Sequence, residues 1–318
     1  MGEITVITPT ANRLLFEVEG KPTTFGRSDE RNYVAIFENR IEMIVNGLGG
    51  VYLRDDVWEI LVIEPYMKGV ERTTIIGVIY QGGPVRFELS EDTCPGLADQ
   101  AVAALAGSWS HLAQEYDYPA TVRWLVGCTA LDQIAMERNP TRFGGEPKTP
   151  VSVESMREIL SIDWGLKNRK ELLAMVPRLY SGVTVKEFMA RTSRAELLDR
   201  KQRSLLKRIA KRGGERTMWA WDLQRMIRMC TDGYIADWLS WEAALDHCLK
   251  AGQKLQTLYS SWDEFQECYL LAYCYWSGER FDDKGSQTAA LRQIYDYYKT
   301  LLINPWQTTW DLSLAREW

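Results

Sequence analysis

The stretch WAWDLQRMIRMCTDG, residues 219–233, decides most about the fold of this chain. It predicts one helix that ends at Gly233, a residue suited to the left-handed turn that closes helices. Helical patterns continue on both sides of it, and nine of the thirteen tryptophans lie within residues 219–318. We therefore expect residues 119–318 to form a larger all-helical, tryptophan-rich domain.

Residues 1–118 have a different pattern, with short runs rich in β-branched and aromatic side chains between Gly, Pro, Asn and Asp. A helix is expected to follow, from about Pro95 to Tyr116. The predicted fold class is therefore α+β, a small antiparallel β-barrel or sandwich with a C-terminal helix, before the all-α domain. This order of elements resembles the pleckstrin-homology-like superfold. The predicted strands are 4–7, 14–18, 33–37, 41–45, 58–63, 74–80 and 85–89.

The composition is that of an ordinary soluble protein, with 46% hydrophobic residues and a net charge of −5 over 318 residues. No run approaches the roughly 20 apolar residues of a membrane span, and the N-terminus has no secretory pattern. The six cysteines form no C-x-x-C pair, which favours reduced thiols and a cytoplasmic location. Only two histidines exist, which excludes a zinc site built on several histidines, and we expect no metal and no cofactor.

Several tryptophans stand next to a carboxylate, and these pairs indicate helix starts. Ser261 followed by Glu264 forms a capping box around Trp262 and Asp263, and Asn168 followed by Glu171 predicts a second helix cap. Thr308, Trp310 and Asp311 are expected to repeat the scheme, and Asp222 is expected near the start of the helix that contains it. The common interpretation is helix initiation with an aromatic residue anchored on a neighbouring helix.

A second interpretation is that these side chains converge on one acidic, aromatic cleft. Clustered carboxylates could bind a divalent cation or share acid and base chemistry, although no catalytic residue can be named. Tryptophan rings there could hold a cation or the face of a sugar or base. The candidates are Trp221, Asp222, Arg225, Trp262, Asp263, Trp310 and Asp311.

The same blocks carry a family resemblance over roughly residues 120–315. AWDLQR at 220–225, GYI at 233–235, WEAA at 241–244, YSSWDEF at 259–265 and NPW at 304–306 resemble the bacterial family called domain of unknown function 1266. Members often have a histidine after the glycine that matches Gly182, where this chain has Val183. The resemblance implies a domain boundary and a bacterial origin, and it implies no activity.

Residues 191–216 form a basic segment with ten Lys or Arg residues and three acids. It is either a solvated helix face or a contact for nucleic acid, an anionic membrane or an acidic protein. It lacks the interleaved aromatic residues that stack on bases. The candidate anion-binding residues are Arg200, Lys201, Arg203, Lys207, Arg208, Lys211 and Arg212.

Three functions fit these features. The first is a non-enzymatic bacterial interaction protein, such as a toxin-neutralising immunity protein or a regulatory scaffold, with an acidic tryptophan-rich surface for a protein partner. The second is a metal-assisted hydrolase or nuclease-like enzyme that uses the clustered acids. The third is an adaptor that binds nucleic acid or an anionic membrane through residues 191–216. We favour the first, because the sequence has no motif for a nucleophile, a phosphate-binding loop or a metal ligand set.

Overall fold

The chain divides into two compact units, Met1–Gln114 and Glu115–Trp318, and each is considered separately. No helix among the described residues is long and apolar enough to cross a bilayer. The computed structural model describes residues 13–20, 32–45, 48–54, 57–68, 71–80, 83–90, 118–136, 138–192, 200–279, 285–299 and 304–318, with single positions at 100, 101, 103, 104, 109, 281 and 283.

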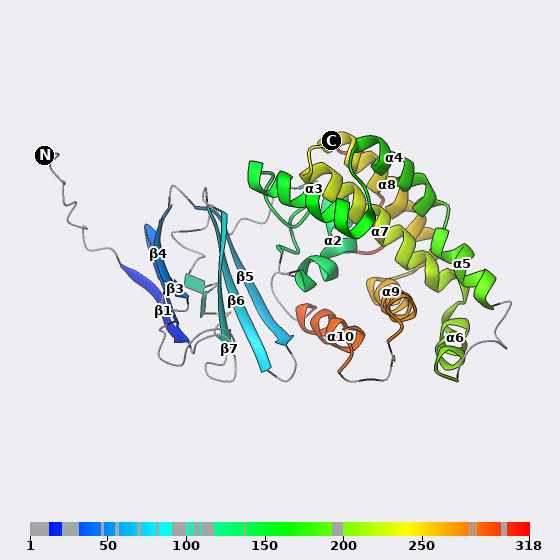
Figure 1. Ribbon diagram of the computed structural model, residues 1–318, viewed down its shortest axis with the longest axis horizontal. Coiled ribbons are helices and arrows are strands. Elements are labelled where there is room, and N and C mark those ends of the chain that lie inside the picture. Colours follow the sequence, from blue (N-terminus) through cyan, green and yellow to red (C-terminus); the bar gives the residue numbers. More distant parts are fainter. Residues whose placement is uncertain are drawn as a thin grey trace, which may run out of the picture. The chain divides into compact units, whose positions relative to one another are not determined.

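The N-terminal unit contains two antiparallel sheets in which each strand pairs with the next one along the chain (Figure 1). The four-stranded sheet consists of β1 (Leu14–Gly20), β2 (Asn32–Phe37), β3 (Arg40–Val45) and β4 (Leu48–Leu53). The three-stranded sheet consists of β5 (Val57–Lys68), β6 (Glu71–Tyr80) and β7 (Gly83–Ser90).

One hydrophobic core joins the two sheets. Strands β2 and β3 pair with Ile36 opposite Ile41, so that their apolar side chains share a face. These side chains pack with Val57 and Val78 of the second sheet. Trp109 completes the core and donates its indole N–H to the Phe37 carbonyl at 2.6 Å. The two sheets before a larger helical region confirm the predicted α+β class.

The strand predictions hold wherever the structure describes the residues, with one omission. Strand β4 was not predicted, because Gly49 and Gly50 favour a loop by composition, yet they pair with Ile44 and Met43 of β3. The predicted strand at 4–7 lies outside the described residues, as does most of the predicted helix between Pro95 and Tyr116.

The C-terminal unit is helical throughout its regular structure (Figure 1). Its helices are α2 (Ala120–Ala135), α3 (Pro150–Trp164), α4 (Arg169–Tyr180), α5 (Val183–Thr192), α6 (Arg200–Arg212), α7 (Glu215–Ile235), α8 (Trp241–Leu258), α9 (Trp262–Ser277) and α10 (Gln287–Tyr298).

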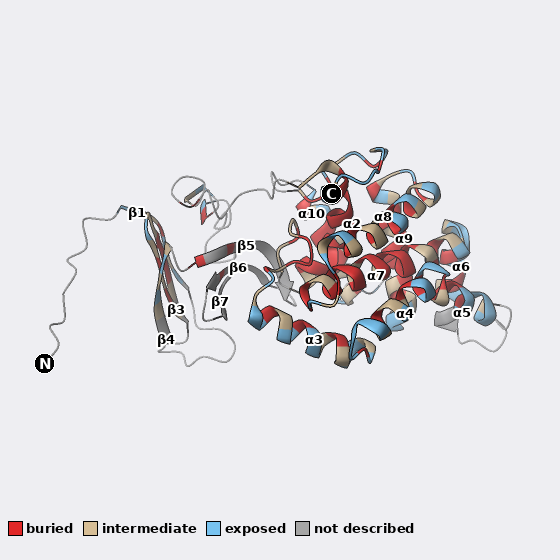
Figure 2. Cartoon of the chain, turned by 90° about the horizontal axis from the view of Figure 1, so that it is seen from above, coloured by how far each residue is buried: buried red, intermediate tan, exposed pale blue. Residues whose placement is uncertain are grey.

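Helix α7 lies at the centre of this unit, and Figure 2 shows it largely in the colour of buried residues. It contacts α8, α9, α4, α5, α2, α3 and α6. Residues from Thr217 to Ile235 are mostly buried on every side, as expected of a helix that others surround. The polar side chains of α7 are therefore brought into the interior, where they need partners.

The predicted helix caps at Ser261 and Asn168 are confirmed. The Ser261 hydroxyl accepts the Glu264 N–H at 3.1 Å, and the Asn168 side chain accepts the Glu171 N–H at 3.1 Å. Pro177 lies inside α4, which ends at Tyr180.

Two predicted helix boundaries are wrong. Gly233 does not end α7, which runs to Ile235. A Cβ added at Gly233 would lie 2.7 Å from Leu172 Cδ1, so this glycine permits close packing of α7 on α4. Thr308 begins no helix, because residues 307–318 have no regular structure apart from a turn at Trp310 and Asp311.

Candidate functional site

Helix α7 brings polar side chains into the middle of the helical unit. Gln224 Nε2 donates to Asp132 Oδ2 on α2 at 2.6 Å, and the Tyr269 hydroxyl on α9 donates to Asp132 Oδ1. All three side chains belong to buried residues. Because buried polar groups are stabilised only when paired, these bonds tie α2, α7 and α9 together at one point.

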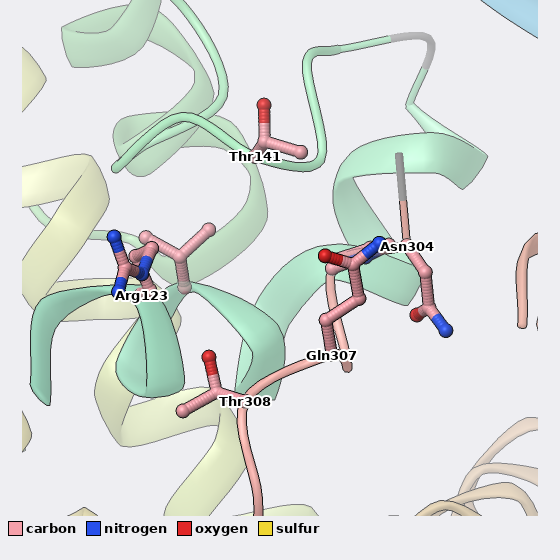
Figure 3. A pocket seen from close by; sticks show the side chains of 7 residues that line it. Arg123, Thr141, Asn304, Gln307 and Thr308 are labelled. Carbon is pink, nitrogen blue, oxygen red and sulfur yellow. The ribbon is translucent and has the colours of Figure 1, made fainter. Parts of the chain in front are cut away.

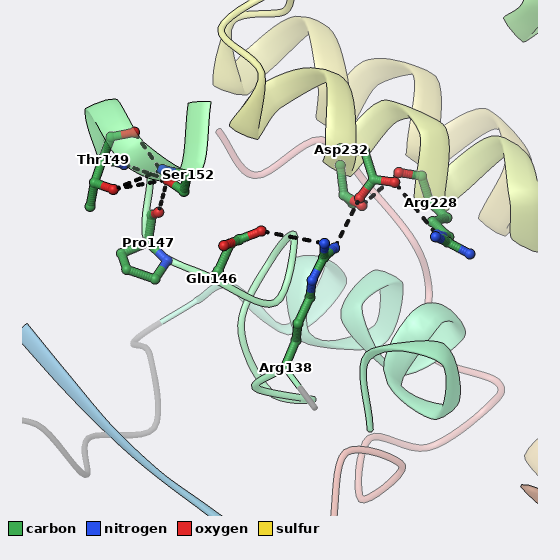
Figure 4. A network of polar contacts seen from close by, with 8 residues as sticks. Arg138, Glu146, Pro147, Thr149, Ser152, Arg228 and Asp232 are labelled. Carbon is green, nitrogen blue, oxygen red and sulfur yellow. Dashed lines mark hydrogen bonds and ion pairs between the residues drawn. The ribbon is translucent and has the colours of Figure 1, made fainter. Parts of the chain in front are cut away.

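Two arginines and a second aspartate extend this arrangement (Figure 4). Arg228 lies between two acids, with Nη1 3.7 Å from Asp132 Oδ2 and Nε 3.5 Å from Asp232 Oδ2. Arg138 Nη1 lies 3.8 Å from Asp232 Oδ1, and its Nη2 lies 3.6 Å from Glu146 Oε1. We call Asp132, Arg138, Gln224, Arg228, Asp232 and Tyr269 the buried polar network.

Burial and neighbouring charges act in opposite directions on the groups of this network. Burial raises the pKa of Asp232, and Arg228 and Arg138 oppose that shift. Burial acts to lower the pKa of Arg228, but Asp232 and Asp132 outweigh it and the pKa is raised. Burial also raises the pKa of Tyr269, which keeps its hydroxyl a proton donor toward Asp132.

Several atoms of the network have no hydrogen-bond partner within the described part of the chain. They are both carboxylate oxygens of Asp232, Arg138 Nη1, Arg228 Nε and Gln224 Oε1. The Asp232 side chain is 0% exposed, so its contacts are ion pairs made at the full cost of desolvation. Buried ion pairs are weak sources of stability, and ionisable groups with perturbed pKa values occur both at functional sites and in structural ion-pair networks.

An aromatic ladder leads from this network to the surface. Trp221 stacks on Tyr269, with ring centroids 5.6 Å apart and 30° between the planes. Its ring also lies 5.3 Å from that of Trp276, and Tyr273 packs against both at 5.8 and 6.0 Å. Trp221 is 5% exposed, whereas Trp276 is 59% exposed near the end of α9. The ladder therefore presents one tryptophan to solvent.

Arg225 joins the ladder one helical turn after Trp221. Its guanidinium carbon lies 4.3 Å from the ring centroid of Trp164, near the end of α3, and 5.1 Å from that of Trp221. Burial lowers the pKa of Arg225, and Asp222 opposes that shift. We call Trp164, Trp221, Arg225, Tyr273 and Trp276 the aromatic–arginine platform, and it is the candidate functional site.

The structure corrects the predicted position of Asp222. This residue does not start a helix, because α7 begins at Glu215 and Asp222 is 0% exposed within it. Its Oδ2 accepts the backbone N–H groups of Thr184 at 2.8 Å and Val185 at 3.3 Å, in the first turn of α5. Burial raises its pKa, and the hydrogen bonds from Thr184 and Val185 oppose that shift. Asp222 therefore caps a helix other than its own.

The other two candidate carboxylates have different surroundings. Asp263 lies in the first turn of α9, as predicted, and its Oδ1 accepts a hydrogen bond from the Tyr295 hydroxyl at 2.8 Å and one from Lys299. Asp311 is exposed in the C-terminal segment. In the part of the chain that the structure describes, no three acid, histidine or cysteine side chains are grouped so that they could hold a metal ion.

Trp262 and Trp310 belong to a second aromatic cluster, with Trp124. The three ring centroids lie 4.9 to 5.0 Å from one another. Trp262 Nε1 donates to the Thr308 carbonyl at 2.7 Å, and Trp310 Nε1 donates to the Tyr259 carbonyl at 2.8 Å. These bonds hold the C-terminal segment against the helices, and the cluster is part of the core.

Residues 200–212 of the basic segment form α6, whose apolar side packs into the unit through Leu206 and Ile209. Arg212 forms an ion pair with Glu267 on α9, and the Arg208 guanidinium carbon lies 4.5 Å from the Phe281 ring centroid. Four of the candidate anion-binding residues, Arg203, Lys207, Arg208 and Lys211, are exposed. The side chains of Arg200 and Lys201 lie outside the described residues.

A pocket of about 350 Å³ lies between α2 and the C-terminal segment (Figure 3). Its described lining offers one guanidinium, two hydroxyls and two side-chain amides, and it shares no residue with the platform. The lining residues are Arg123, Val126, Thr141, Asn304, Pro305, Gln307 and Thr308. Sequence analysis did not single out any of them as a site residue.

Sequence analysis also did not predict the network residues Asp132, Arg228 and Asp232, or a site role for Trp164 and Trp276. One signal was present, because Arg228 and Asp232 stand four residues apart in a helix whose other residues are largely apolar. Nothing in the sequence places Asp132 beside them, since this contact joins helices that are distant along the chain.

Residues 159–310 match the family model described as Protein of unknown function (DUF1266). This range contains the whole aromatic–arginine platform and all of the network except Asp132 and Arg138. The match supports placing this part of the chain in that family. No curated protein and no solved structure matches the chain.

Proposed function

We propose that this chain is a non-enzymatic interaction protein, of the toxin-neutralising or regulatory scaffold type, that binds a protein partner through the platform. The observation that carries the proposal is Trp276, which is 59% exposed although Trp221 and Tyr273 hold its ring in place. Tryptophan, tyrosine and arginine are the residues most enriched among those that dominate binding energy in protein interfaces. A ring already held in place loses little conformational entropy on binding.

The contacts between the buried polar network and the platform also support this proposal. The Tyr269 hydroxyl donates a hydrogen bond to Asp132, and the Tyr269 ring stacks on Trp221. Tyr269 therefore connects the aromatic ladder to the buried polar network. The network joins α2, α7 and α9 and so limits movement of the exposed Trp276 on α9. A rigid support of this kind is what a preorganised binding surface needs.

The experiment compares Trp276→Ala with wild type as baits in a pull-down from the lysate of the native cell. Tyr180→Ala is the matched control, because Tyr180 is 40% exposed at the end of α4 and takes no part in the platform. We expect one retained protein to be lost with Trp276→Ala and kept with Tyr180→Ala, at unchanged melting temperatures. The proposal is wrong if wild type and Trp276→Ala retain the same proteins.

A second candidate function is an adaptor for nucleic acid or an anionic membrane, and the exposed side of α6 favours it. Arg203, Lys207 and Lys211 are exposed there, and no acid of the described residues forms an ion pair with them. Binding of DNA or of phosphatidylserine vesicles should then fall steeply with salt and disappear when all three are changed to Gln. Salt-independent binding, or binding that the triple variant retains, would count against it.

The metal-assisted enzyme alternative draws less support, because Asp222 and Asp263 are engaged in contacts that hold α5 and α10. We further infer a bacterial and cytoplasmic protein with a pleckstrin-homology-like N-terminal unit. The two antiparallel sheets followed by helical residues near Ala101 support the last point.

A further inference from the structure

Arg225 differs from the other arginines in the interior of the helical unit. Arg228 and Arg138 form ion pairs with Asp232, and Arg216 forms one with Glu264 at 2.6 Å. Arg225 is only partly exposed, yet no side chain or carbonyl among the described residues accepts a hydrogen bond from it or forms an ion pair with it. Its close contacts are the rings of Trp164 and Trp221.

This arrangement leaves the guanidinium oriented but without a hydrogen-bonding partner. The aromatic faces attract the cation and position it, and they accept none of its five N–H donors in the usual way. A partly desolvated guanidinium is costly unless an anion pairs with it, and its planar fork matches a carboxylate in a two-bond geometry. The unused N–H donors of Arg225 are therefore suited to a carboxylate of a bound molecule.

We propose that Arg225 binds an aspartate or glutamate side chain of a protein partner, while Trp276 and the exposed part of Trp164 contact the apolar residues next to that acid. This inference rests on the proposed function and names the partner chemistry of the same site. It makes Arg225 the specificity-determining residue and Trp276 the residue that supplies most of the buried area.

The charge around the platform favours a single carboxylate over a phosphate polymer. The chain has a net charge of −5, and the exposed Asp163 stands immediately before Trp164. Asp222 lies close enough to influence the ionisation of Arg225. Nucleic acid would bring many negative charges to this acidic neighbourhood, whereas an acidic peptide brings one to the unpaired cation.

The test uses the full chain and a random dodecapeptide library displayed on phage. We expect the selected peptides to share an Asp or Glu next to apolar residues. A synthetic copy of the most enriched peptide is then titrated, by fluorescence anisotropy, against wild type and variants. Arg225→Gln should weaken its binding by about tenfold or more, as expected when one partner of a charge-assisted pair is removed. Arg178→Gln is the matched control, because Arg178 is exposed on α4 and is not part of the platform.

A double-mutant cycle connects the effect to one pair of side chains. The acid of the peptide is replaced by its amide, and this peptide should bind wild type and Arg225→Gln with equal affinity. Trp276→Ala should weaken the acidic peptide and its amide form by the same factor. Arg225→Lys, which keeps the charge and loses the planar fork, replaces Arg225→Gln if that variant has a lowered melting temperature.

The outcomes separate this inference from the proposed function. If Trp276→Ala weakens binding but the cycle shows no coupling between Arg225 and the acid, the carboxylate assignment is overturned and the interaction function stands. If no peptide depends on either residue, both are overturned. Peptides that match an acidic segment of this chain, together with a dimer in analytical ultracentrifugation, would overturn the assignment to a separate partner.

Discussion

Asp222 accepts a hydrogen bond from the backbone N–H of Thr184 at 2.8 Å, between residues 38 positions apart in the sequence. The same carboxylate oxygen accepts the N–H of Val185 at 3.3 Å. The first N–H groups of a helix have no hydrogen-bond acceptor within the helix. For α5, the Asp222 side chain of α7 supplies that acceptor. The bond joins the central helix to α5, next to the platform residues Trp221 and Arg225.

Replacing Asp222 by alanine should destabilise the helical unit. The change removes the acceptor of two N–H groups, and losing a helix cap of this kind costs about 1 to 2 kcal/mol. Chemical denaturation measures the loss, and hydrogen exchange should speed up at Thr184 and Val185. Asp311→Ala is the matched control, because this exposed acid should change the stability by less than about 0.5 kcal/mol. Equal stability of the two variants would contradict the assignment of a capping role.

The stability contributed by Asp222 should depend on pH with a defined sign. Burial raises its pKa above the ordinary aspartate value of 3.8, so the folded state binds the proton more tightly than the unfolded state does. The free energy of unfolding therefore falls as pH rises from 3.8 to the folded pKa, and it levels off above that pKa. The side chain of Asp222→Asn does not titrate. The difference in the free energy of unfolding between wild type and this variant, measured by denaturation at a series of pH values, therefore isolates the contribution of Asp222. A difference that increases with pH would show that the hydrogen bonds outweigh burial.

Replacing Gly233 by alanine should destabilise the protein, although alanine is normally better in a helix by about 1 kcal/mol. The added Cβ would lie 2.7 Å from Leu172 Cδ1 and 3.3 Å from Leu239 Cδ1, so the buried Leu172 side chain or the helix that carries it must shift. We expect a net loss of about 1 to 3 kcal/mol in denaturant unfolding, typical of overpacking. In the double variant Gly233→Ala with Leu172→Ala, the loss should be smaller than the sum of the two single losses. If the two stability losses were strictly additive, the cost of Gly233→Ala would not come from its contact with Leu172.

Replacing Trp310 by phenylalanine should loosen the C-terminal segment. The change keeps an aromatic ring but removes the indole N–H that donates to the buried Tyr259 carbonyl at 2.8 Å. An unsatisfied buried acceptor costs about 1 to 3 kcal/mol. Denaturation measures this cost, and hydrogen exchange should increase across residues 304–318. Trp318→Phe is the control, because its indole donates to the half-exposed Asp246 and should matter less.

The features that sequence analysis predicted well are those that depend on near neighbours. Ser261 and Glu264, or Asn168 and Glu171, are three residues apart, so the geometry of one helical turn brings them together in any context. The alternation in β2 and β3 is local in the same sense, and Glu38 and Asn39 connect the strands directly. These elements were sufficient for the α+β class.

Thr308 and Gly233 show where local patterns mislead. Thr308 and Asp311 have the spacing of a helix cap, but no helix follows Thr308. Instead, the Thr308 carbonyl accepts the Trp262 indole N–H and holds the segment against α9. Gly233 has the composition of a helix end, but it is needed for the approach of Leu172. In both places, tertiary packing outweighs a local preference of about 1 kcal/mol.

The sequence by itself determined the α+β class, the helix starts at Asn168 and Ser261, and the abundance of tryptophan beside acids in the helical unit. Only the tertiary structure decided what those residues do. It separated Trp221 and Arg225 from Trp262 and Trp310, made Asp222 the cap of another helix, and placed Asp132 beside Arg228. The physical reason is that a capping bond spans one turn of chain, whereas burial, ion pairing and ring stacking depend on which helices pack together, and no local spacing encodes that choice.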